Sequence, residues 1–234
     1  SCLLLKEFLS AREVEFEAID VSHPEGRQAL AALGLDSAPA VAVGERAIQG
    51  LALADVPEFV GLEAELEVRL SPAALLARLD LILAAAERTL RQLPEAHMAD
   101  LVPSRDRSWR QLGYHVFVIA EAFLAATKGA ELSYESLAVT PPDEVRTGAD
   151  VAAYGADVRR RLGNWSYPGG EGTVIPTYYG EQTLHQVLER TTWHAAQHVR
   201  QLESLLEGLG IEPDRALTAA DLEGLPLPSE IWEG

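Results

Sequence analysis

Apolar residues recur at two different periods along the chain, and the period changes between about residues 62 and 71. Before the change, short apolar runs alternate with helical patterns in the order helix, strand, helix, strand, strand, helix. After it, apolar residues recur three and four positions apart over long stretches, which is typical of amphipathic helices. The pattern predicts an α/β domain over residues 1–62 and an all-helical domain over residues 71–234.

The N-terminal segment is expected to alternate between helices and short strands. Residues 14–21, VEFEAIDV, alternate apolar and acidic positions, which indicates a half-buried strand. The runs PAVAV and RAIQ are separated only by Gly44 and Glu45, so they predict a hairpin. We expect helices over residues 3–13, 24–35 and 52–61, and strands over residues 14–21, 39–43 and 46–49.

The C-terminal segment is expected to form an antiparallel four-helix bundle, because its long helical patterns are joined by loop-like connections. Ser71 is a suitable N-cap for the first helix, and Pro72 suits its first turn. The polar, Gly-rich residues 164–180 are expected only to separate the last two helices, and residues 212–234 to pack along the bundle as an extended arm. The four helices are predicted over residues 71–93, 106–128, 143–162 and 181–208.

Charge and composition exclude several classes of protein. The chain carries 19 Lys and Arg against 36 Asp and Glu, a formal charge of −17, so it should repel the phosphates of nucleic acids. No stretch approaches the roughly 20 apolar residues that span a bilayer. The single cysteine excludes a disulfide framework and fits a reducing cytoplasm. Because the chain opens on Ser-Cys directly inside a helical pattern, we expect further residues upstream.

The best indication of function is a pair of histidines in the last predicted helix. His194 and His198 are four residues apart, so both imidazoles project from one face and can hold a divalent metal. His115 lies mid-helix in an apolar stretch and can supply a third imidazole from a facing helix. No HExxH glutamate accompanies the pair, so a protease is not indicated, and an incidental pair is the alternative. The histidines expected outside the site are His23, His97 and His185.

Residues beside the pair are candidates for contacting a ligand. Arg190 lies one turn before His194, and Gln201 lies three residues after His198, so each could touch a bound anion or orient a ligand; a packing or surface role is the alternative for both. Aromatic residues are expected to line a pocket mouth or, by default, to pack in the core. These aromatic residues are Trp109, Tyr114, Trp165, Tyr178, Tyr179 and Trp193.

The mid-helix histidine, the sequences TLHQVLE and HAAQHVRQLE, and the tail LTAADLEGLPLP together resemble the DinB/YfiT-like superfamily of four-helix metalloproteins. The resemblance covers residues 71–234. It implies that His115, His194 and His198 bind Zn²⁺ or Ni²⁺, and three imidazoles also suit Fe²⁺. Several members of the superfamily are transferases or isomerases that use bacillithiol, mycothiol or glutathione, and many have no known activity.

The start of the chain resembles glutaredoxins, in which a CxxC motif is followed after three residues by Lys and then by an aromatic and an aliphatic residue. The matching residues are Cys2, Lys6, Phe8 and Leu9. On this alignment Cys2 is the second cysteine of the motif, and the first cysteine and the opening strand would precede residue 1. The resemblance implies that Pro39 is the cis-proline beside the redox site. It also implies that Gly50 binds the end of the thiol tripeptide.

Both resemblances imply small-thiol chemistry, so we expect a cytoplasmic metal-dependent thiol S-transferase with a small thiol and a small-molecule electrophile as substrates. A thiol bound to a divalent metal loses its proton and becomes a nucleophile at neutral pH. Cys2 would add a monothiol redox role, with an inert helix-terminal cysteine as the alternative. The alternative functions are a non-catalytic metal-binding or interaction protein, dimeric through its long helices, with a degenerate thioredoxin-like module, or a thiol-disulfide oxidoreductase with an accessory bundle.

Overall fold

The computed structural model describes residues 2–51, 55–62, 70–103, 105–169 and 172–232. The chain divides into two compact units, Ser1–Val68 and Arg69–Trp232. Over the described residues the fold is mixed but mostly helical, with two small antiparallel sheets of two strands each. Among these residues, no helix combines the length and the apolar character that crossing a bilayer requires.

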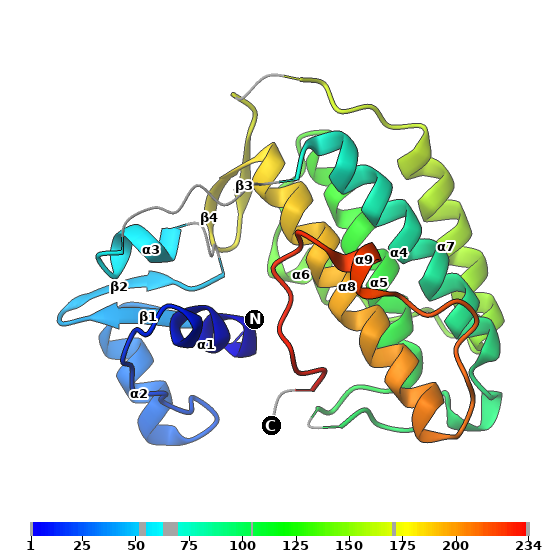
Figure 1. The fold of residues 1–234 in the computed structure, drawn as a ribbon, viewed down its shortest axis with the longest axis horizontal. Helices are drawn as coiled ribbons and strands as arrows, with labels where there is room; N and C mark the ends of the chain where they lie inside the picture. Colours follow the sequence, from blue (N-terminus) through cyan, green and yellow to red (C-terminus); the bar gives the residue numbers. More distant parts are fainter. Residues whose placement is uncertain (1, 52–54, 63–69, 104, 170–171, 233–234) are drawn as a thin grey trace. The chain divides into compact units, whose positions relative to one another are not determined.

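The N-terminal unit consists of short helices and one β-hairpin (Figure 1). Its elements are α1 (Cys2–Ala11), α2 (Pro24–Ala32), β1 (Ala40–Val43), β2 (Arg46–Gln49) and α3 (Val56–Phe59). The predicted hairpin is confirmed: β1 and β2 are antiparallel, with Ala40 opposite Gln49 and Val43 opposite Arg46. Gly44 occupies the turn with a φ of 63°, a conformation that glycine adopts without strain.

The core of the N-terminal unit forms where α1 and α3 bury apolar side chains with the hairpin. The buried residues of this core are Leu5, Leu9, Val41 and Val56, and the partly buried residues around them include Phe8, Ile48 and Phe59. Gly50 closes the hairpin against this core: its N–H donates to the Pro39 carbonyl at 2.8 Å. A Cβ at Gly50 would lie 2.6 Å from Leu5 Cδ2, so a larger residue here would displace the Leu5 side chain.

The strand predicted over residues 14–21 is wrong. Residues 14–20 follow α1 without strand structure, and residues 15–20 are exposed. Phe16, which the alternating pattern places with Val14 on one face, is 42% exposed, and Ile19 is 60% exposed. An alternating pattern becomes a half-buried strand only when a neighbouring strand pairs with it, and within the described residues the sheet of this unit contains only β1 and β2.

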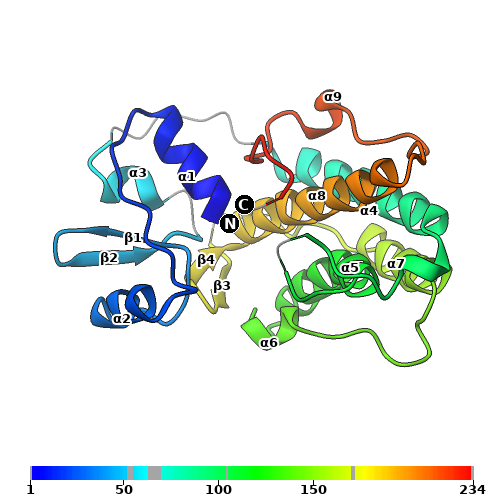
Figure 2. The ribbon, with the colours of Figure 1, turned by 90° about the horizontal axis from the view of Figure 1, so that it is seen from below.

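The C-terminal unit is a four-helix bundle with a hairpin and a tail (Figures 1 and 2). Its long helices are α4 (Pro72–Gln92), α5 (Trp109–Ala126), α7 (Gly148–Gly163) and α8 (Leu184–Gly208). The shorter elements are η2 (Glu95–His97), α6 (Tyr134–Leu137), β3 (Val174–Thr177), β4 (Gly180–Thr183) and α9 (Ala219–Leu222). The four predicted long helices are therefore all present.

Side-chain caps set where the long helices begin. The predicted cap at Ser71 is confirmed, because its side chain accepts a hydrogen bond from the Ala74 N–H. The third helix begins at Gly148 rather than near residue 143, because Thr147 and Asp150 form a reciprocal capping box there. Further capping boxes start α5, at Ser108 and Gln111, and α8, at Thr183 and Gln186.

The antiparallel arrangement predicted for the four long helices holds for only some of the neighbouring pairs. Arg159, near the end of α7, pairs with Asp80 in the first half of α4, and Gly148, at the start of α7, lies against the Leu90 carbonyl near the end of α4, so these two helices are antiparallel. In contrast α5 and α7 run parallel: Arg110, at the start of α5, donates to the Val145 carbonyl just before α7, and Arg161, near the end of α7, pairs with Glu121 on α5. The long connection over residues 127–147, which contains α6, lets the chain return to the same end of the bundle before α7 begins.

The segment predicted as a plain connection over residues 164–180 contains a strand among its described residues. Residues 174–177 and 180–183 form the antiparallel hairpin β3–β4, with Val174 opposite Thr183. The Leu132 N–H donates to the Pro176 carbonyl, which ties this hairpin to the segment before α6. Proline and glycine within such short runs conceal the strand pattern in the sequence, although the hairpin leads directly into α8.

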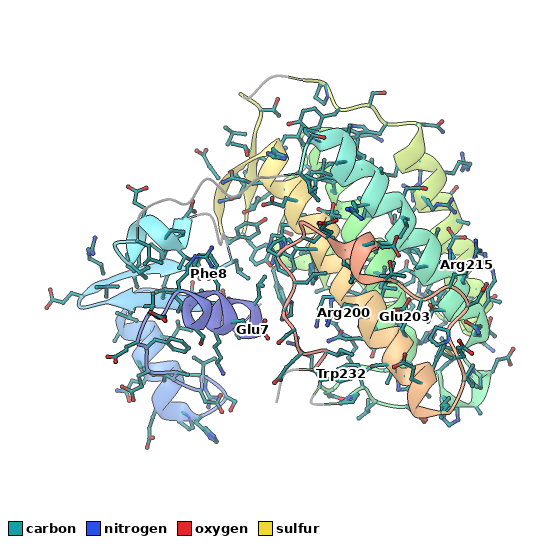
Figure 3. All side chains as sticks on the ribbon, viewed as in Figure 1. Glu7, Phe8, Arg200, Glu203, Arg215 and Trp232 are labelled. Atoms are coloured by element: carbon teal, nitrogen blue, oxygen red, sulfur yellow. The ribbon has the colours of Figure 1, made fainter. Side chains whose placement is uncertain are left out.

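The C-terminal tail packs along α8, as expected, although residues 219–222 form the short helix α9. Arg200 donates to the carbonyls of Pro228 and Ser229, and the Trp232 indole N–H donates to Ser204 Oγ. Glu203, buried to 7% exposure, accepts a hydrogen bond from the Leu217 N–H. Figure 3 labels Arg200, Glu203 and Trp232, which join the tail to the bundle at separate points.

Candidate metal centre

The structure brings the three predicted histidines together inside the bundle. His115 projects from α5, and His194 and His198 project from successive turns of α8. The ring centroid of His115 lies 5.4 Å from that of His194 and 5.1 Å from that of His198. One nitrogen from each ring lies within 4.8 Å of the others. These residues therefore form a group that can hold a metal ion.

The packing of α5 against α8 creates this convergence (Figures 1 and 2). The four-residue spacing aligns the two α8 imidazoles, and their Nε2 atoms are 3.1 Å apart. With metal–nitrogen bonds of about 2.0–2.1 Å, two nitrogens on a tetrahedral metal lie about 3.3 Å apart. The pair is thus close to the separation that one shared metal requires.

Gln201 fixes which nitrogen His198 offers. Nδ1 of His198 contacts Gln201 Oε1 at 2.7 Å, and Gln201 Nε2 donates to the Ile231 carbonyl at 3.0 Å. Because a carbonyl can only accept, the second contact orients the amide and makes its oxygen face His198. Nδ1 therefore carries the proton, and Nε2 keeps a free lone pair for a metal. The predicted orienting role of Gln201 agrees with this contact.

His115 is oriented in a similar way by a hydrogen bond to the backbone of Leu137, at the end of α6. The side chain of His115 is only 7% exposed. The third imidazole differs, because Nδ1 of His194 is buried without a hydrogen-bond partner among the described residues. Two of the three candidate ligands thus have the outer partner that metal-binding histidines usually have.

The imidazoles are held in the neutral form that a metal requires. Burial lowers the pKa of His115 and of His194 well below the usual value. It lowers the pKa of His198 to about 3, and the charges of Arg107 and Arg105 contribute to this decrease. At neutral pH all three rings therefore offer lone pairs. The positive charges of Arg105 and Arg107 therefore act on two of these histidines, although the net charge of the chain is −17.

The donor set fits a divalent metal. Three neutral imidazoles are a common ligand set for Zn²⁺ and also suit Ni²⁺ and Fe²⁺, and they leave at least one position for an outside ligand. Among the described residues, the group consists of histidines alone. The metal would therefore keep its full positive charge, which is the property that activates a bound ligand.

Arg190, the other predicted neighbour, is 8% exposed and lies among aromatic rings. Its guanidinium carbon is 4.7 Å from the ring centroid of Tyr179 and 5.6 Å from that of Trp193. Its Nη2 donates to the Tyr178 hydroxyl at 3.0 Å. Three of the six aromatic residues predicted near the site therefore surround Arg190, namely Tyr178, Tyr179 and Trp193. The other members stack elsewhere: Trp109 on His97, Tyr114 on Tyr154 and Trp165 against Phe123.

The remaining histidines lie outside the group, as expected. His185 Nε2 contacts the Leu70 carbonyl at 2.9 Å, and His97 Nδ1 contacts Asp100 at 2.6 Å. His23 is exposed. None of these three belongs to the metal-binding group of the described residues.

The predicted thiol-site residues lie in the N-terminal unit. Cys2 begins α1 and is partly buried. Pro39 immediately precedes β1, and its peptide bond with Ala38 is cis, as the glutaredoxin resemblance implies. Gly50 follows β2 and is adjacent to Pro39, whose carbonyl accepts the Gly50 N–H.

Some residues that shape the site carry no local signal in the sequence. Arg107 precedes α5, yet its charge acts on His115 and His198. Leu137 and Ile231 contribute through backbone carbonyls, which any residue provides. Searches against known protein families and against curated proteins found no match to the chain.

Proposed function

We propose that the chain is a metal-dependent thiol S-transferase whose metal is held by His115, His194 and His198. The observation that supports this proposal most strongly is the convergence of three neutral imidazoles, with one nitrogen from each within 4.8 Å. A binding module needs no open coordination position, whereas three protein ligands leave one for substrate. We propose further that the bundle is of the DinB/YfiT-like type.

His115, His194 and His198 would hold the metal, which would supply a positive charge that lowers the pKa of a bound thiol, so that the thiolate would be available at neutral pH. His198 and His115 are kept oriented by Gln201 and by the Leu137 backbone. The charges of Arg105 and Arg107 favour an anionic sulfur near the site. The thiol proton passes to solvent, the sulfur forms a bond to the electrophilic carbon, and the electrons of the broken bond leave with the leaving group.

We propose that the N-terminal unit is glutaredoxin-like and handles the small thiol or its mixed disulfide. Support comes from Pro39 and Gly50, which flank the β1–β2 hairpin and are joined by a backbone hydrogen bond of 2.8 Å. In this proposal the Gly50 backbone receives the end of the thiol. Cys2, at the start of α1, is the residue for thiol exchange.

Metal analysis of protein purified without chelators tests the first half of this proposal. We expect about one Zn²⁺, Ni²⁺ or Fe²⁺ per chain in the wild type and almost none in the His194→Ala, His198→Ala double variant, because two of three ligands are lost. His185→Ala is the matched control, since His185 lies on the same helix but contacts Leu70 instead. Equal metal content in the wild type and the double variant would refute the metal site.

Transfer of a small thiol to an aryl halide tests the second half. We expect Zn²⁺ or Ni²⁺ to restore activity to chelator-treated wild type but not to the double variant. Full metal binding without any thiol transfer would instead favour the non-catalytic metal-binding alternative. Reduction of a mixed disulfide of the small thiol that persists in the double variant and requires Cys2 would favour the oxidoreductase alternative.

A further inference from the structure

A small space adjoins His194. It offers about 10 Å³ for the centre of a water molecule, which is about what a single water-sized occupant needs. Its lining is mostly apolar, with few polar groups. The polar or charged residues of the lining are Tyr179, Arg190, Thr191 and His194, and the apolar ones are Ile119, Leu132, Leu137 and Val187.

Three of these lining residues carry a buried polar atom without a partner. The atoms are the Tyr179 hydroxyl, Arg190 Nε and His194 Nδ1, and they are three of only five such side-chain atoms among the described residues. Buried polar groups are nearly always hydrogen-bonded. Three unpaired groups around one small space therefore indicate that an occupant belongs there.

Two of the three atoms are donors whatever else is bound. The Arg190 Nε–H can only donate. Burial raises the pKa of Tyr179, so its hydroxyl keeps its proton. Among the described residues, no carboxylate forms an ion pair with Arg190, which instead contacts the Tyr178 hydroxyl and aromatic rings. A cation that is only 8% exposed favours an anion beside it.

The third atom changes role with the metal. His198 Nε2 has only a lone pair, because Nδ1 of that ring donates to Gln201. In the contact of 3.1 Å between the two Nε2 atoms, His194 must therefore be the donor, and its Nδ1 is then a lone pair. When Nε2 of His194 gives its lone pair to a metal instead, the proton must reside on Nδ1. Nδ1 then becomes a third donor.

We propose that the space lined by Tyr179, Arg190 and His194 is an anion site that is coupled to the metal through the tautomer of His194. With metal bound, the Tyr179 hydroxyl, Arg190 Nε and His194 Nδ1 can all donate to an anion in the space. Without metal, His194 Nδ1 carries a lone pair instead, which repels an anion there. The inference rests on the metal-binding half of the proposed function. The occupant is a small anion, either a halide or a carboxylate about as small as formate, because the space is small.

The coupling is tested by measuring Zn²⁺ affinity through competition with a chromophoric chelator, at one ionic strength, in sodium bromide, sodium formate or sodium gluconate. Gluconate is too large for the space. After correction for Zn²⁺ binding by the anions in solution, we expect bromide or formate to tighten Zn²⁺ binding ~5-fold or more, which is typical of coupled sites. An effect of bromide alone indicates a free halide as occupant, and an effect of formate alone indicates a carboxylate.

Two variants separate this site from an anion bound on the metal itself. Tyr179→Phe and Arg190→Met should each abolish the anion effect while Zn²⁺ still binds in gluconate. Tyr167→Phe is the matched control, since its hydroxyl is not part of the lining, and it should keep the effect. If Arg190→Met does not fold, Tyr179→Phe alone decides the outcome.

Two results would overturn the inference. One is a Zn²⁺ affinity that is equal in all three salts. The other is an anion effect that persists in Tyr179→Phe, which would place the anion on the metal. Neither result contradicts the three-histidine metal site. A wild type that binds no Zn²⁺ would refute both the proposed function and the coupling.

Discussion

Replacing Gln201 with leucine should weaken metal binding while leaving α8 intact. Gln201 Oε1 accepts from His198 Nδ1 at 2.7 Å, and this contact fixes both the ring orientation and the tautomer of the ligand. Leucine is close to glutamine in size and helix propensity but offers no acceptor. Loss of such an outer partner typically costs about 10–100-fold in metal affinity, which corresponds to about 1.4–2.8 kcal/mol.

Gln197→Leu is a close control, because both glutamines lie on α8 and both donate to the Ile231 carbonyl, at 2.8 Å and 3.0 Å. Only Gln201 contacts a histidine. Chelator competition should therefore show a large loss of Zn²⁺ affinity for Gln201→Leu and little change for Gln197→Leu. Gln201→Glu should retain tight binding, since a carboxylate accepts the same proton more strongly.

Equal losses of Zn²⁺ affinity in the two leucine variants would refute this reasoning. The lost hydrogen bond to the Ile231 carbonyl, which both glutamines make, would then explain the effect. An unchanged affinity in Gln201→Leu would show that the orientation of His198 does not depend on Gln201. Urea unfolding of each metal-free variant must accompany the affinity measurements. A similar free energy of unfolding in both variants separates a loss of ligand orientation from a general loss of stability.

Two further predictions concern stability. The three clustered imidazoles have lowered pKa values when folded, so they stay neutral while the unfolded chain takes up protons. The metal-free protein should therefore lose about 1.4 kcal/mol of stability per pH unit for each histidine as pH falls below about 6.5. The contribution of His198 should level off near pH 3. Urea unfolding at pH 7 and pH 5 checks this, and an unchanged free energy would contradict the burial of the rings. Gly148→Ala should destabilise the bundle by about 1–3 kcal/mol, because the new Cβ would lie 1.9 Å from the Leu90 carbonyl oxygen. Gly163→Ala, whose Cβ meets nothing within 4 Å, should not destabilise the protein, and similar losses in both variants would contradict the steric explanation.

Local patterns predicted most of the helices, the β1–β2 hairpin and the cap at Ser71, because each depends on residues a few positions apart. The strand expected over residues 14–21 failed for the opposite reason. Its alternating pattern requires a partner strand, and none pairs with it among the described residues. The start of α7 and the β3–β4 hairpin were missed where proline and glycine mask the periodicity, even though Thr147 and Asp150 form a recognisable capping pair.

For the site, the sequence by itself determined that His194 and His198 share one face of a helix, since a four-residue spacing is close to one turn. It also suggested His115, Arg190 and Gln201 as neighbours. Only the tertiary structure decided that Gln201 selects the tautomer of His198, and that Tyr179 from the hairpin meets Arg190 and His194 around one space. Helical periodicity is a local property of the backbone, whereas these contacts join segments whose meeting depends on how whole helices pack.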